Sequence, residues 1–301
     1  MFMSASNLPS HAHPSRRRWL GQALALGAAP WVHRAGAQTA AGPEAGVLRF
    51  SPVNQYGIQL TAAYWNPIIR HVSERSGQQL QLKIGRTSAD TTAYVLAQEV
   101  EIVFSNHLFS PERERLGWRV FGRRLTPPVH SQVLVFADSP ITQLAELTGR
   151  EVAFPGPEAL VAYKMAAAQL VAQQVDFKTV FGGNMDGAFA QLASGKVAAV
   201  GANSQLAEGY TKREGRAFRA LWTSQPLHDL ALMASSKVSD AARKAVAQAF
   251  VGMGQDKRGR EVLAQASAQV GLPADAGFVA SDGSEYGAYR DFYRNAPAHL
   301  K

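Results

Sequence analysis

Hydrophobic and polar positions follow two different periods along most of this chain. Residues 79–84 alternate polar and apolar side chains, which predicts a strand, whereas residues 60–75 form an amphipathic pattern that predicts a helix ended by Gly77. Further strands are predicted at 47–50, 101–104, 132–136, 152–154, 177–181, 197–200 and 218–222, and further helices at 93–99, 142–147, 158–174, 186–194, 205–213, 240–253, 257–270 and 285–294. Strands and helices that alternate in this order predict an α/β fold.

The first forty residues have the pattern of an export signal. Residues 15–20 read Ser-Arg-Arg-Arg-Trp-Leu, an apolar stretch covers 19–32, and Ala35-Gly36-Ala37 offers the small side chains of a cleavage site. This stretch is too short to cross a bilayer as a helix, which takes about 20 residues. We therefore predict a twin-arginine signal peptide over 1–37, cleaved near Ala37, then a linker over 38–46. The protein is expected in the periplasm, without membrane insertion after cleavage.

The absence of cysteine narrows the possible chemistry. With no Cys in 301 residues, the chain has no disulfide framework, no thiolate metal ligand, no thiol nucleophile and no lipoprotein anchor at the cleavage site. The hydrophobic content of 46% supports real cores, and the residues after position 37 are enough for two ordinary domains.

The charge of the chain does not indicate a nucleic-acid partner. The formal net charge of +8 includes four arginines of residues 1–37, a segment without acidic residues, so the chain after it carries +4. The densest basic run, residues 113–124, is interrupted by Glu114 and by apolar residues. Nucleic-acid binding requires clustered basic residues with interleaved aromatics, so we interpret this run as a solvated face.

No motif in the sequence indicates catalysis. The chain contains no G-x-S-x-G nucleophile elbow, no H-E-x-x-H pair and no glycine-rich phosphate loop before a helix. The histidines after the predicted signal are His71, His107, His130, His228 and His299. None of them is spaced from another like a metal ligand. We therefore predict a protein that is not an enzyme, with no cofactor and no metal.

Two segments of the chain echo each other. Residues 93–106 and 188–203 each read as a helix, a polar turn and a buried strand that ends in an asparagine, Asn106 in one case and Asn203 in the other. The match is short, and βαβ units look alike, so coincidence is an equal alternative. If the echo is real, it predicts two lobes of similar build. Ligands of open α/β sheets bind beyond the carboxyl ends of the strands, where both asparagines would lie.

Residues 47–295 resemble the periplasmic solute-binding proteins of the phosphate, phosphite and phosphonate type. The likeness is carried, in order, by residues 48–50, 63–69, 76–78, 137–141, 144–154, 180–186, 195–197 and 221–226. The resemblance implies two Rossmann-like lobes joined by a two-strand hinge, the type-2 periplasmic-binding fold. Lobe I would comprise 47–128 and 226–301, and lobe II would comprise 129–225, with the hinge strands near 129–134 and 223–230. The lobes would close on the ligand.

The resemblance also implies a ligand class, from which the sequence departs in two places. In this family a hydroxyl-rich turn after the strand at 152–154 binds the anionic head, but residues 155–162 contain no hydroxyl, and Glu158 adds a negative charge. Backbone N–H groups at the helix start, such as those of Leu160 and Val161, remain as anion donors. The acidic residue that the family often places at position 202 or 203 is absent as well. The ligand is therefore either a phosphorus oxyanion or a different small organic solute.

Candidate ligand-binding residues are the polar positions that follow the predicted strands or begin the helices. The predicted set is Tyr56, Asn106, His107, His130, Leu160, Val161, Tyr163, Asn184, Asn203 and His228, with Asn54 and Gln55 beside Tyr56. Two members have structural alternatives, because Asn184 fits a helix N-cap and His228 fits a hinge pair with Asp229. The expected partner is the permease of an ABC transporter or the periplasmic sensor domain of a signalling histidine kinase.

Overall fold

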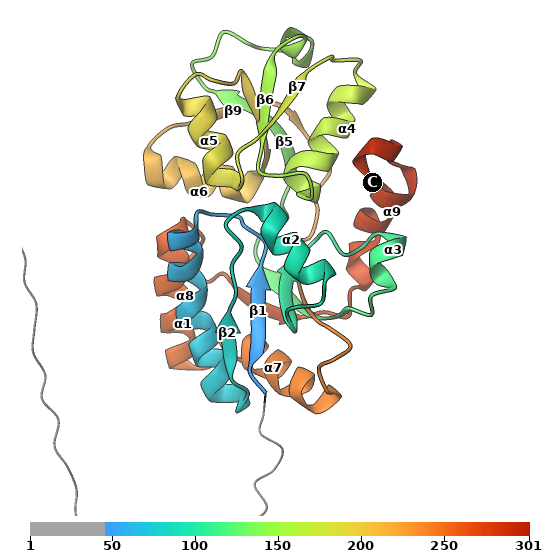
Figure 1. Cartoon of the computed structure of the whole chain (residues 1–301). Helices are drawn as coiled ribbons and strands as arrows, with labels where there is room; N and C mark the ends of the chain where they lie inside the picture. The colour runs from blue at the N-terminus through green and yellow to red at the C-terminus, as the bar shows by residue number, and fades with distance from the viewer. Residues whose placement is uncertain (1–45) are drawn as a thin grey trace, which may run out of the picture. The chain divides into compact units, whose positions relative to one another are not determined.

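Two mixed sheets organise residues 46–301, the part of the chain that this computed structural model describes (Figure 1). The predicted signal peptide and nearly all of the predicted linker lie outside these residues. One sheet has the order β11-β4-β10-β3-β1-β2, and its strands are β1 (Leu48–Pro52), β2 (Leu80–Leu82), β3 (Ile102–Ser105), β4 (Arg119–Leu125), β10 (Ala231–Ala234) and β11 (Gly277–Ala280). The other has the order β7-β6-β8-β5-β9, and its strands are β5 (Ser131–Phe136), β6 (Glu151–Phe154), β7 (Lys178–Phe181), β8 (Ala199–Asn203) and β9 (Phe218–Thr223).

Each sheet carries its own helices, and we call the two assemblies the six-stranded half and the five-stranded half. The six-stranded half holds α1 (Ile58–Ser76), α2 (Ser88–Leu96), α3 (Pro111–Glu114), α7 (Asp240–Gly252), α8 (Lys257–Val270) and α9 (Gly287–Asn295). The five-stranded half holds α4 (Met165–Ala172), α5 (Met185–Ala193) and α6 (Ser204–Glu214). Short helical turns lie at Leu144–Leu147, Leu160–Lys164, Ser284–Tyr286 and Ala298–Leu300. The predicted α/β class is confirmed.

Helix α1 shows how the apolar pattern builds the core of the six-stranded half. Its buried face carries Trp65, whose ring centroid lies 4.7 Å from that of Phe50 on β1 and 5.0 Å from that of Phe104 on β3. Aromatic pairs at this distance stabilise the core beyond the gain from the apolar area that they bury. The helix ends as predicted at Gly77, whose φ of 68° is a left-handed conformation that favours glycine.

The parallel strands of both sheets determine where a ligand can bind. Strand β1 pairs in parallel with β2 and β3, and β6 pairs in parallel with β7 and β8. The loops after β1, β3, β6 and β8 therefore leave from carboxyl ends, which is the edge where α/β sheets bind ligands.

The sequence interpretation of residues 113–124 as a solvated face is wrong. Residues 119–125 form β4, which lies inside the six-stranded sheet between β10 and β11. Arg124 on this strand is completely buried, and its Nε donates to Asp229 Oδ2 at 2.6 Å. A buried arginine requires such a partner, and the partner lies far away in the sequence, so the local pattern could not reveal the strand. Strands β10 and β11 were not predicted either.

The chain crosses between the halves at one short antiparallel pair. The Val129 backbone N–H donates to the Leu227 carbonyl at 2.9 Å, and the Leu227 N–H donates to the Val129 carbonyl at 2.8 Å. These residues lie on the connections from β4 to β5 and from β9 to β10. The predicted lobe boundaries lie beside this pair.

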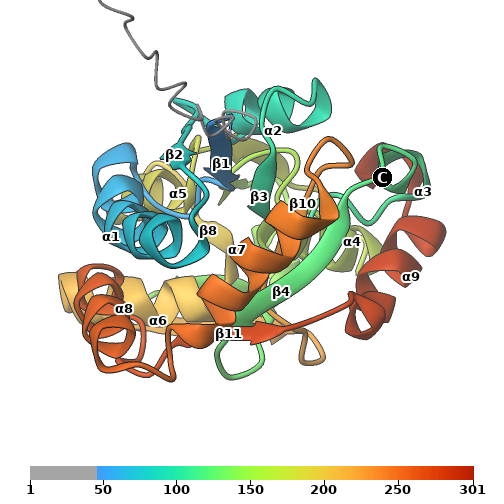
Figure 2. The ribbon, with the colours of Figure 1, turned by 90° about the horizontal axis from the view of Figure 1, so that it is seen from below.

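Helices α6 and α8 bring the two halves into close contact, and they lie side by side in both ribbon views (Figures 1 and 2). A Cβ atom placed on Gly209 of α6 would lie 2.6 Å from the Val270 carbonyl oxygen, and one on Gly271 would lie 2.8 Å from the Gly209 Cα. Arg213 Nη1 also donates to the Val270 carbonyl at 3.0 Å. The backbones of the two helices approach this closely because Gly209 and Gly271 have no side chain.

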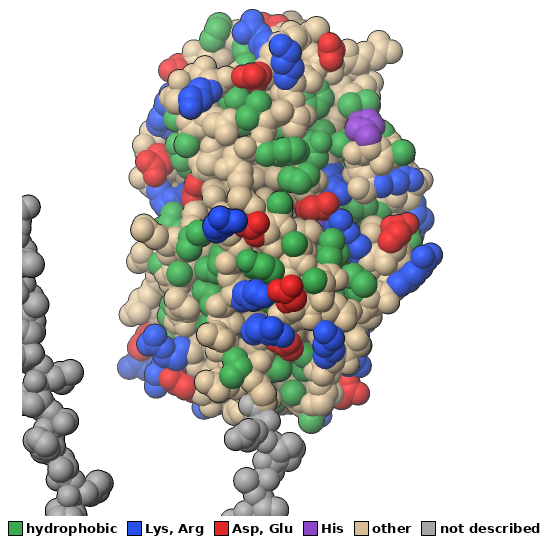
Figure 3. Space-filling model, viewed as in Figure 1, with side chains coloured by type: hydrophobic (Ala, Val, Ile, Leu, Met, Phe, Trp, Pro, Cys, Tyr) green, Lys and Arg blue, Asp and Glu red, His purple; other side chains and the backbone are tan. Residues whose placement is uncertain are grey.

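The surface of the described residues carries charges of both signs. On the face shown in Figure 3, basic and acidic side chains are interspersed and do not form a single patch of one sign. Among residues 46–301, no helix is both long enough and apolar enough to cross a bilayer. In the same range no three histidine or acidic side chains gather in an arrangement that could hold a metal ion.

Candidate ligand-binding site

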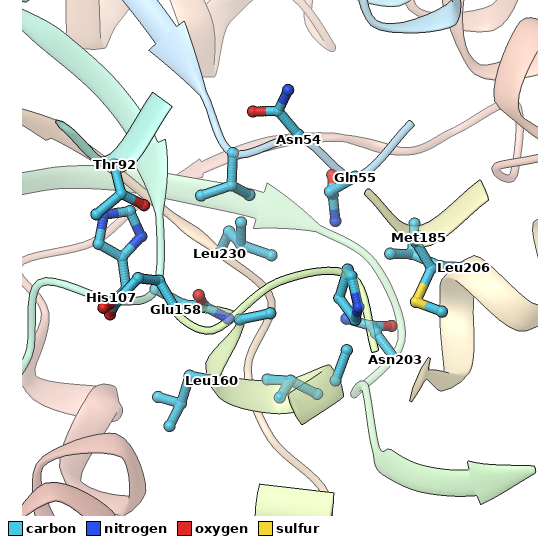
Figure 4. A pocket seen from close by; sticks show the side chains of 16 residues that line it. Asn54, Gln55, Thr92, His107, Glu158, Leu160, Met185, Asn203, Leu206 and Leu230 are labelled. Atoms are coloured by element: carbon cyan, nitrogen blue, oxygen red, sulfur yellow. The ribbon is translucent and has the colours of Figure 1, made fainter. Parts of the chain in front are cut away.

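A small cavity lies between the two halves at the carboxyl ends of their parallel strands (Figure 4). Its volume is about 60 Å³. That is room for about four to six water-sized groups, so the cavity fits a small ion or molecule. The six-stranded half contributes Val53, Asn54, Gln55, Thr92, Asn106, His107 and Leu230, and the five-stranded half contributes Pro155, Glu158, Ala159, Leu160, Val161, Ala162, Met185, Asn203 and Leu206.

Two asparagines reach the cavity from opposite halves. Asn106 directly follows β3, and Asn203 is the last residue of β8. Asn203 Oδ1 accepts a hydrogen bond from the Gln205 N–H at 2.9 Å and so caps α6, which leaves its Nδ2 group for the cavity. The Asn106 side chain is 6% exposed and forms no hydrogen bond with any residue from 46 to 301. Both asparagines of the sequence echo therefore line one cavity.

The loop after β1 supplies two further amides with different tasks. Asn54 Nδ2 donates to the Gly85 carbonyl at 2.9 Å, and its Oδ1 accepts from the Thr91 hydroxyl, so Asn54 orients the loop. Gln55 Oε1 accepts from Arg124 Nη2 at 3.3 Å. The Gln55 Nε2 group donates to no residue of the described chain, so it is a free donor at the cavity.

His107 is a neutral donor in the wall of the cavity. The side chain is 1% exposed, and burial together with the charge of Arg113 lowers the pKa of His107 to about 3. Its Nδ1 lies 2.9 Å from the Ser105 hydroxyl, which accepts the His107 backbone N–H at 3.3 Å. In the tautomer in which the Ser105 hydroxyl donates to Nδ1, the ring proton of His107 lies on Nε2. Nε2 is buried and has no partner within residues 46–301.

The helix predicted at 158–174 begins instead with a π-helical turn, Leu160–Lys164, and continues as α4 to Ala172. The Lys164 N–H donates to the Ala159 carbonyl at 3.0 Å, five residues back. Single π-turns of this kind are frequent at functional sites. The first N–H groups of a helix have no partner within it, so those of Leu160, Val161 and Ala162 are available to a ligand.

Glu158 is the single carboxylate in the cavity wall, and its charge is compensated. Arg113 Nη1 donates to Glu158 Oε2 at 2.7 Å, and Lys164 Nζ lies 3.3 Å from the same oxygen. Burial would raise the pKa of Glu158, but the hydrogen bond from Arg113 and the charges of Arg113 and Lys164 outweigh it and lower the pKa. The negative charge noted in the sequence therefore meets two cations and does not oppose an anion.

Behind the cavity, Arg124 connects the two halves. Besides its ion pair with Asp229, it donates through Nη2 to Gln205 Oε1 of the five-stranded half at 2.9 Å and to Gln55 Oε1 of the six-stranded half at 3.3 Å. Its guanidinium lies 5.0 Å from the ring centroid of Phe104. Burial would lower the pKa of Arg124, but the charge and hydrogen bond of Asp229, with Tyr64 and Tyr56 nearby, together outweigh burial and raise it.

Contacts between the halves surround the cavity. The Ser88 N–H donates to the Gly183 carbonyl at 3.0 Å, and the Gly57 N–H donates to Asp186 Oδ2 at 3.1 Å. Together with the approach of α6 to α8, these bonds hold the two halves against each other. The structure is therefore a closed arrangement of the two halves.

Five of the ten predicted binding residues line the cavity. They are Asn106, His107, Leu160, Val161 and Asn203, and the neighbouring Asn54 and Gln55 line it as well. Each of them lies at a strand end or a helix start, which is the position that led to its prediction.

The other five predicted residues lie outside the cavity wall. Tyr56 is 2% exposed and belongs to the hydrophobic core, and His130 Nδ1 donates to the Ser224 carbonyl at 2.8 Å near the crossing. The Tyr163 ring packs against neighbouring aromatic rings. Asn184 caps α5 by accepting the Gly187 N–H at 2.9 Å, which is its structural alternative. His228 is exposed.

The sequence did not point to several further residues of the cavity wall. Met185 and Leu206 occupy the first turns of α5 and α6, and Thr92 lies on α2, which begins five residues earlier than predicted. The order of strand and helix offered a signal, because a helix that follows a parallel strand starts at the same edge of the sheet.

The two sheets and the cavity between them define a two-lobed α/β binding protein of the periplasmic type. A family model described as ABC transporter, phosphonate, periplasmic substrate-binding protein matches residues 50–286, and the chain belongs to this family. The predicted family and fold class are confirmed. The family consists of periplasmic proteins that bind a small ligand and work with an ABC transporter. No protein of curated function matches the chain.

Solved structures share this fold at low sequence identity. A binding-protein component of an ABC phosphonate transporter from Pseudomonas aeruginosa is 17% identical, with a TM-score of 0.71, over 83% of this chain and 87% of its own. PhnD1 from Prochlorococcus marinus in complex with methylphosphonate is 15% identical, with a TM-score of 0.68, over 82% and 97%. A protein from Xanthomonas citri bound to ATP is 13% identical, with a TM-score of 0.61, over 84% and 96%.

Proposed function

We propose that this protein binds a small phosphorus oxyanion in the cavity between its halves and delivers it to an ABC transporter in the periplasm. Export through the signal at residues 1–37 would bring it there. The structural relative from Prochlorococcus marinus holds methylphosphonate, which supports the ligand class. The observation that carries the proposal is a group of unpaired hydrogen-bond donors that line the cavity between the halves.

These donors come from both halves and carry no full charge. The six-stranded half offers the Asn106 amide and the His107 Nε2–H, and the five-stranded half offers the Asn203 amide and the N–H groups of Leu160 and Val161. Backbone N–H groups at a helix start bind anions without a hydroxyl or a cation. A ligand held by donors of both halves stabilises the closed arrangement, because it makes these contacts only when the halves are together.

The charges around the cavity are compatible with an anion. The carboxylates Glu158, Asp186 and Asp229 each meet an arginine within 2.7 Å, and Glu158 meets Lys164 in addition. Each of these three carboxylates is balanced by its arginine, so none of them opposes an anion in the cavity or is free to pair with a cationic solute.

Movement about the crossing segments would admit the ligand. Val129 and Leu227 are the paired residues at this point, so we place the hinge there, at the edges of lobe I (47–128 and 226–301) and lobe II (129–225). A hinge of a few residues at the ends of strands is the common device for closing two lobes around a ligand.

Isothermal titration calorimetry on the chain from Gln38 onward tests the proposal. The ligand panel comprises phosphate, phosphite, methylphosphonate, sulfonates, carboxylates and amino acids. We expect binding of a phosphorus oxyanion, and a ligand at 100 times its Kd should stabilise the fold by about 2.7 kcal/mol. Binding of only sulfonates, carboxylates or amino acids would overturn the proposed ligand class.

A matched pair of variants locates the site. Asn106→Ala removes an amide that the protein itself does not use, so the ligand-free protein should keep its stability while the affinity falls about tenfold. Asn295→Ala, at the end of α9, changes the same side chain outside the cavity wall and should leave the affinity unchanged. Equal affinities of the two variants would place the ligand elsewhere.

A further inference from the structure

On the basis of the proposed function, we infer that the cavity selects small phosphonates that lack an ammonium group. The inference rests on the pairing of its one carboxylate and on the neutral character of the remaining wall. It is a statement about the substituent of the ligand, whereas the proposed function concerns the oxyanion.

The negative charge of Glu158 is already balanced by two cations, which makes this residue a poor counterion for an ammonium group. Its Oε2 already accepts from Arg113 at 2.7 Å and lies 3.3 Å from Lys164 Nζ. The Arg113 Nη1 group also donates to the His107 carbonyl at 3.0 Å, which fixes the arginine in this position. Figure 4 shows Glu158 beside His107, at the same end of the cavity. A ligand ammonium placed here would be a third cation beside a single half-buried carboxylate.

Apart from Glu158, the described residues of the cavity wall include no group that could neutralise the charge of an ammonium group. Val53, Leu160, Leu206, Leu230 and Met185 are apolar and form the walls between the amides. Neutral amide and imidazole groups lower the cost of burying a charge but do not replace a counterion. An alkyl group of the same size is buried there with a gain, because it leaves water for apolar surroundings.

The nearby acids behind the wall are engaged as well. Asp229 pairs with Arg124 at 2.6 Å, and Asp186 pairs with Arg213 at 2.6 Å. Neither carboxylate lines the cavity. The described part of the chain therefore presents no unpaired carboxylate to a ligand in this cavity.

Two isosteric ligands test the inference. Ethylphosphonate and aminomethylphosphonate have the same number of heavy atoms, and they differ in whether a methyl or an ammonium group stands at the end of the substituent. We expect calorimetry to give an affinity at least 100-fold higher for ethylphosphonate. Affinities within threefold of each other would overturn the inference and leave the proposed function standing. If neither phosphonate binds, and phosphate and phosphite do not bind either, the proposed ligand class fails and the inference fails with it.

A variant that adds a carboxylate to the cavity wall provides a second test. Asn203→Asp adds one carboxylate to the wall and keeps the cap of α6, because aspartate caps helices as well as asparagine does. We expect the preference for ethylphosphonate over aminomethylphosphonate to fall by at least tenfold. Asn184→Asp makes the same change at the cap of α5, outside the wall, and should leave the preference unchanged. An unchanged preference in Asn203→Asp would also contradict the inference.

Discussion

The substitution Gly209→Ala should affect the stability of each half and the closing of the two halves in different ways. The residue lies in the middle of α6, where glycine is less favourable than alanine by about 1 kcal/mol. It also touches α8 of the other half, where a Cβ atom would lie 2.6 Å from the Val270 carbonyl oxygen. Gly209→Ala should therefore act in opposite directions on the open protein and on the closed one.

The size of the expected loss in affinity follows from the contact between Gly209 and Val270. Overpacking by one methyl group typically costs about 1–3 kcal/mol, and here the neighbour is backbone, which yields less readily than a side chain. The cost arises only when α6 meets α8, so it is subtracted from the free energy of closing. Because about 1.4 kcal/mol corresponds to a factor of ten, we expect the ligand affinity to fall by about 5- to 150-fold.

Two measurements on Gly209→Ala check this reasoning. Urea unfolding without ligand should show equal or higher stability, and calorimetry should show weaker binding of the ligand found for the unaltered protein. Gly252→Ala, at the end of α7, is the matched control, because a Cβ atom there meets nothing within 4 Å. If both variants bind the ligand equally well, α6 and α8 do not meet in the liganded form and the reasoning is refuted.

Three further predictions concern groups around the cavity. Gln205→Leu removes the bond from Arg124 to the five-stranded half, so the affinity should fall about tenfold by calorimetry, whereas Gln132→Leu, on the surface of one half, should change little. Arg124→Met leaves Asp229 buried without its cation and should lower the free energy of urea unfolding by about 3–5 kcal/mol; a loss below 1 kcal/mol would contradict this. The lowered pKa of His107, about 3 when folded, means that folding favours the neutral ring. This difference in pKa corresponds to roughly 5 kcal/mol in the free energy of unfolding, which is present above pH 6.5 and is lost as the pH falls toward 3. Unfolding measured against pH should therefore be less acid-sensitive in His107→Gln than in the unaltered protein.

The elements with strong local signals were predictable from the sequence. Helix α1 was found from its apolar face and its terminal glycine, and β6 and β8 were found from their short apolar runs. The asparagines that follow or end such strands, Asn106 and Asn203, led to the cavity because strand ends share one edge of a sheet. Strand β4 escaped detection because its arginines break the apolar alternation that marks a strand.

The two electrostatic misjudgements made from the sequence share one cause. From the sequence alone, Glu158 is a charge that opposes an anion, and the run that contains Arg113 and Arg124 is a solvated face. In the structure Arg113 pairs with Glu158 across 45 residues, and Arg124 pairs with Asp229 across 105 residues. When only the local segment is considered, Glu158 looks unfavourable for an anion, and the two arginines look unpaired. The ion pairs balance the negative charge in the cavity wall and leave neutral donors there. The proposed oxyanion would bind to these donors, without the hydroxyl-rich turn or the acid that the family resemblance implies.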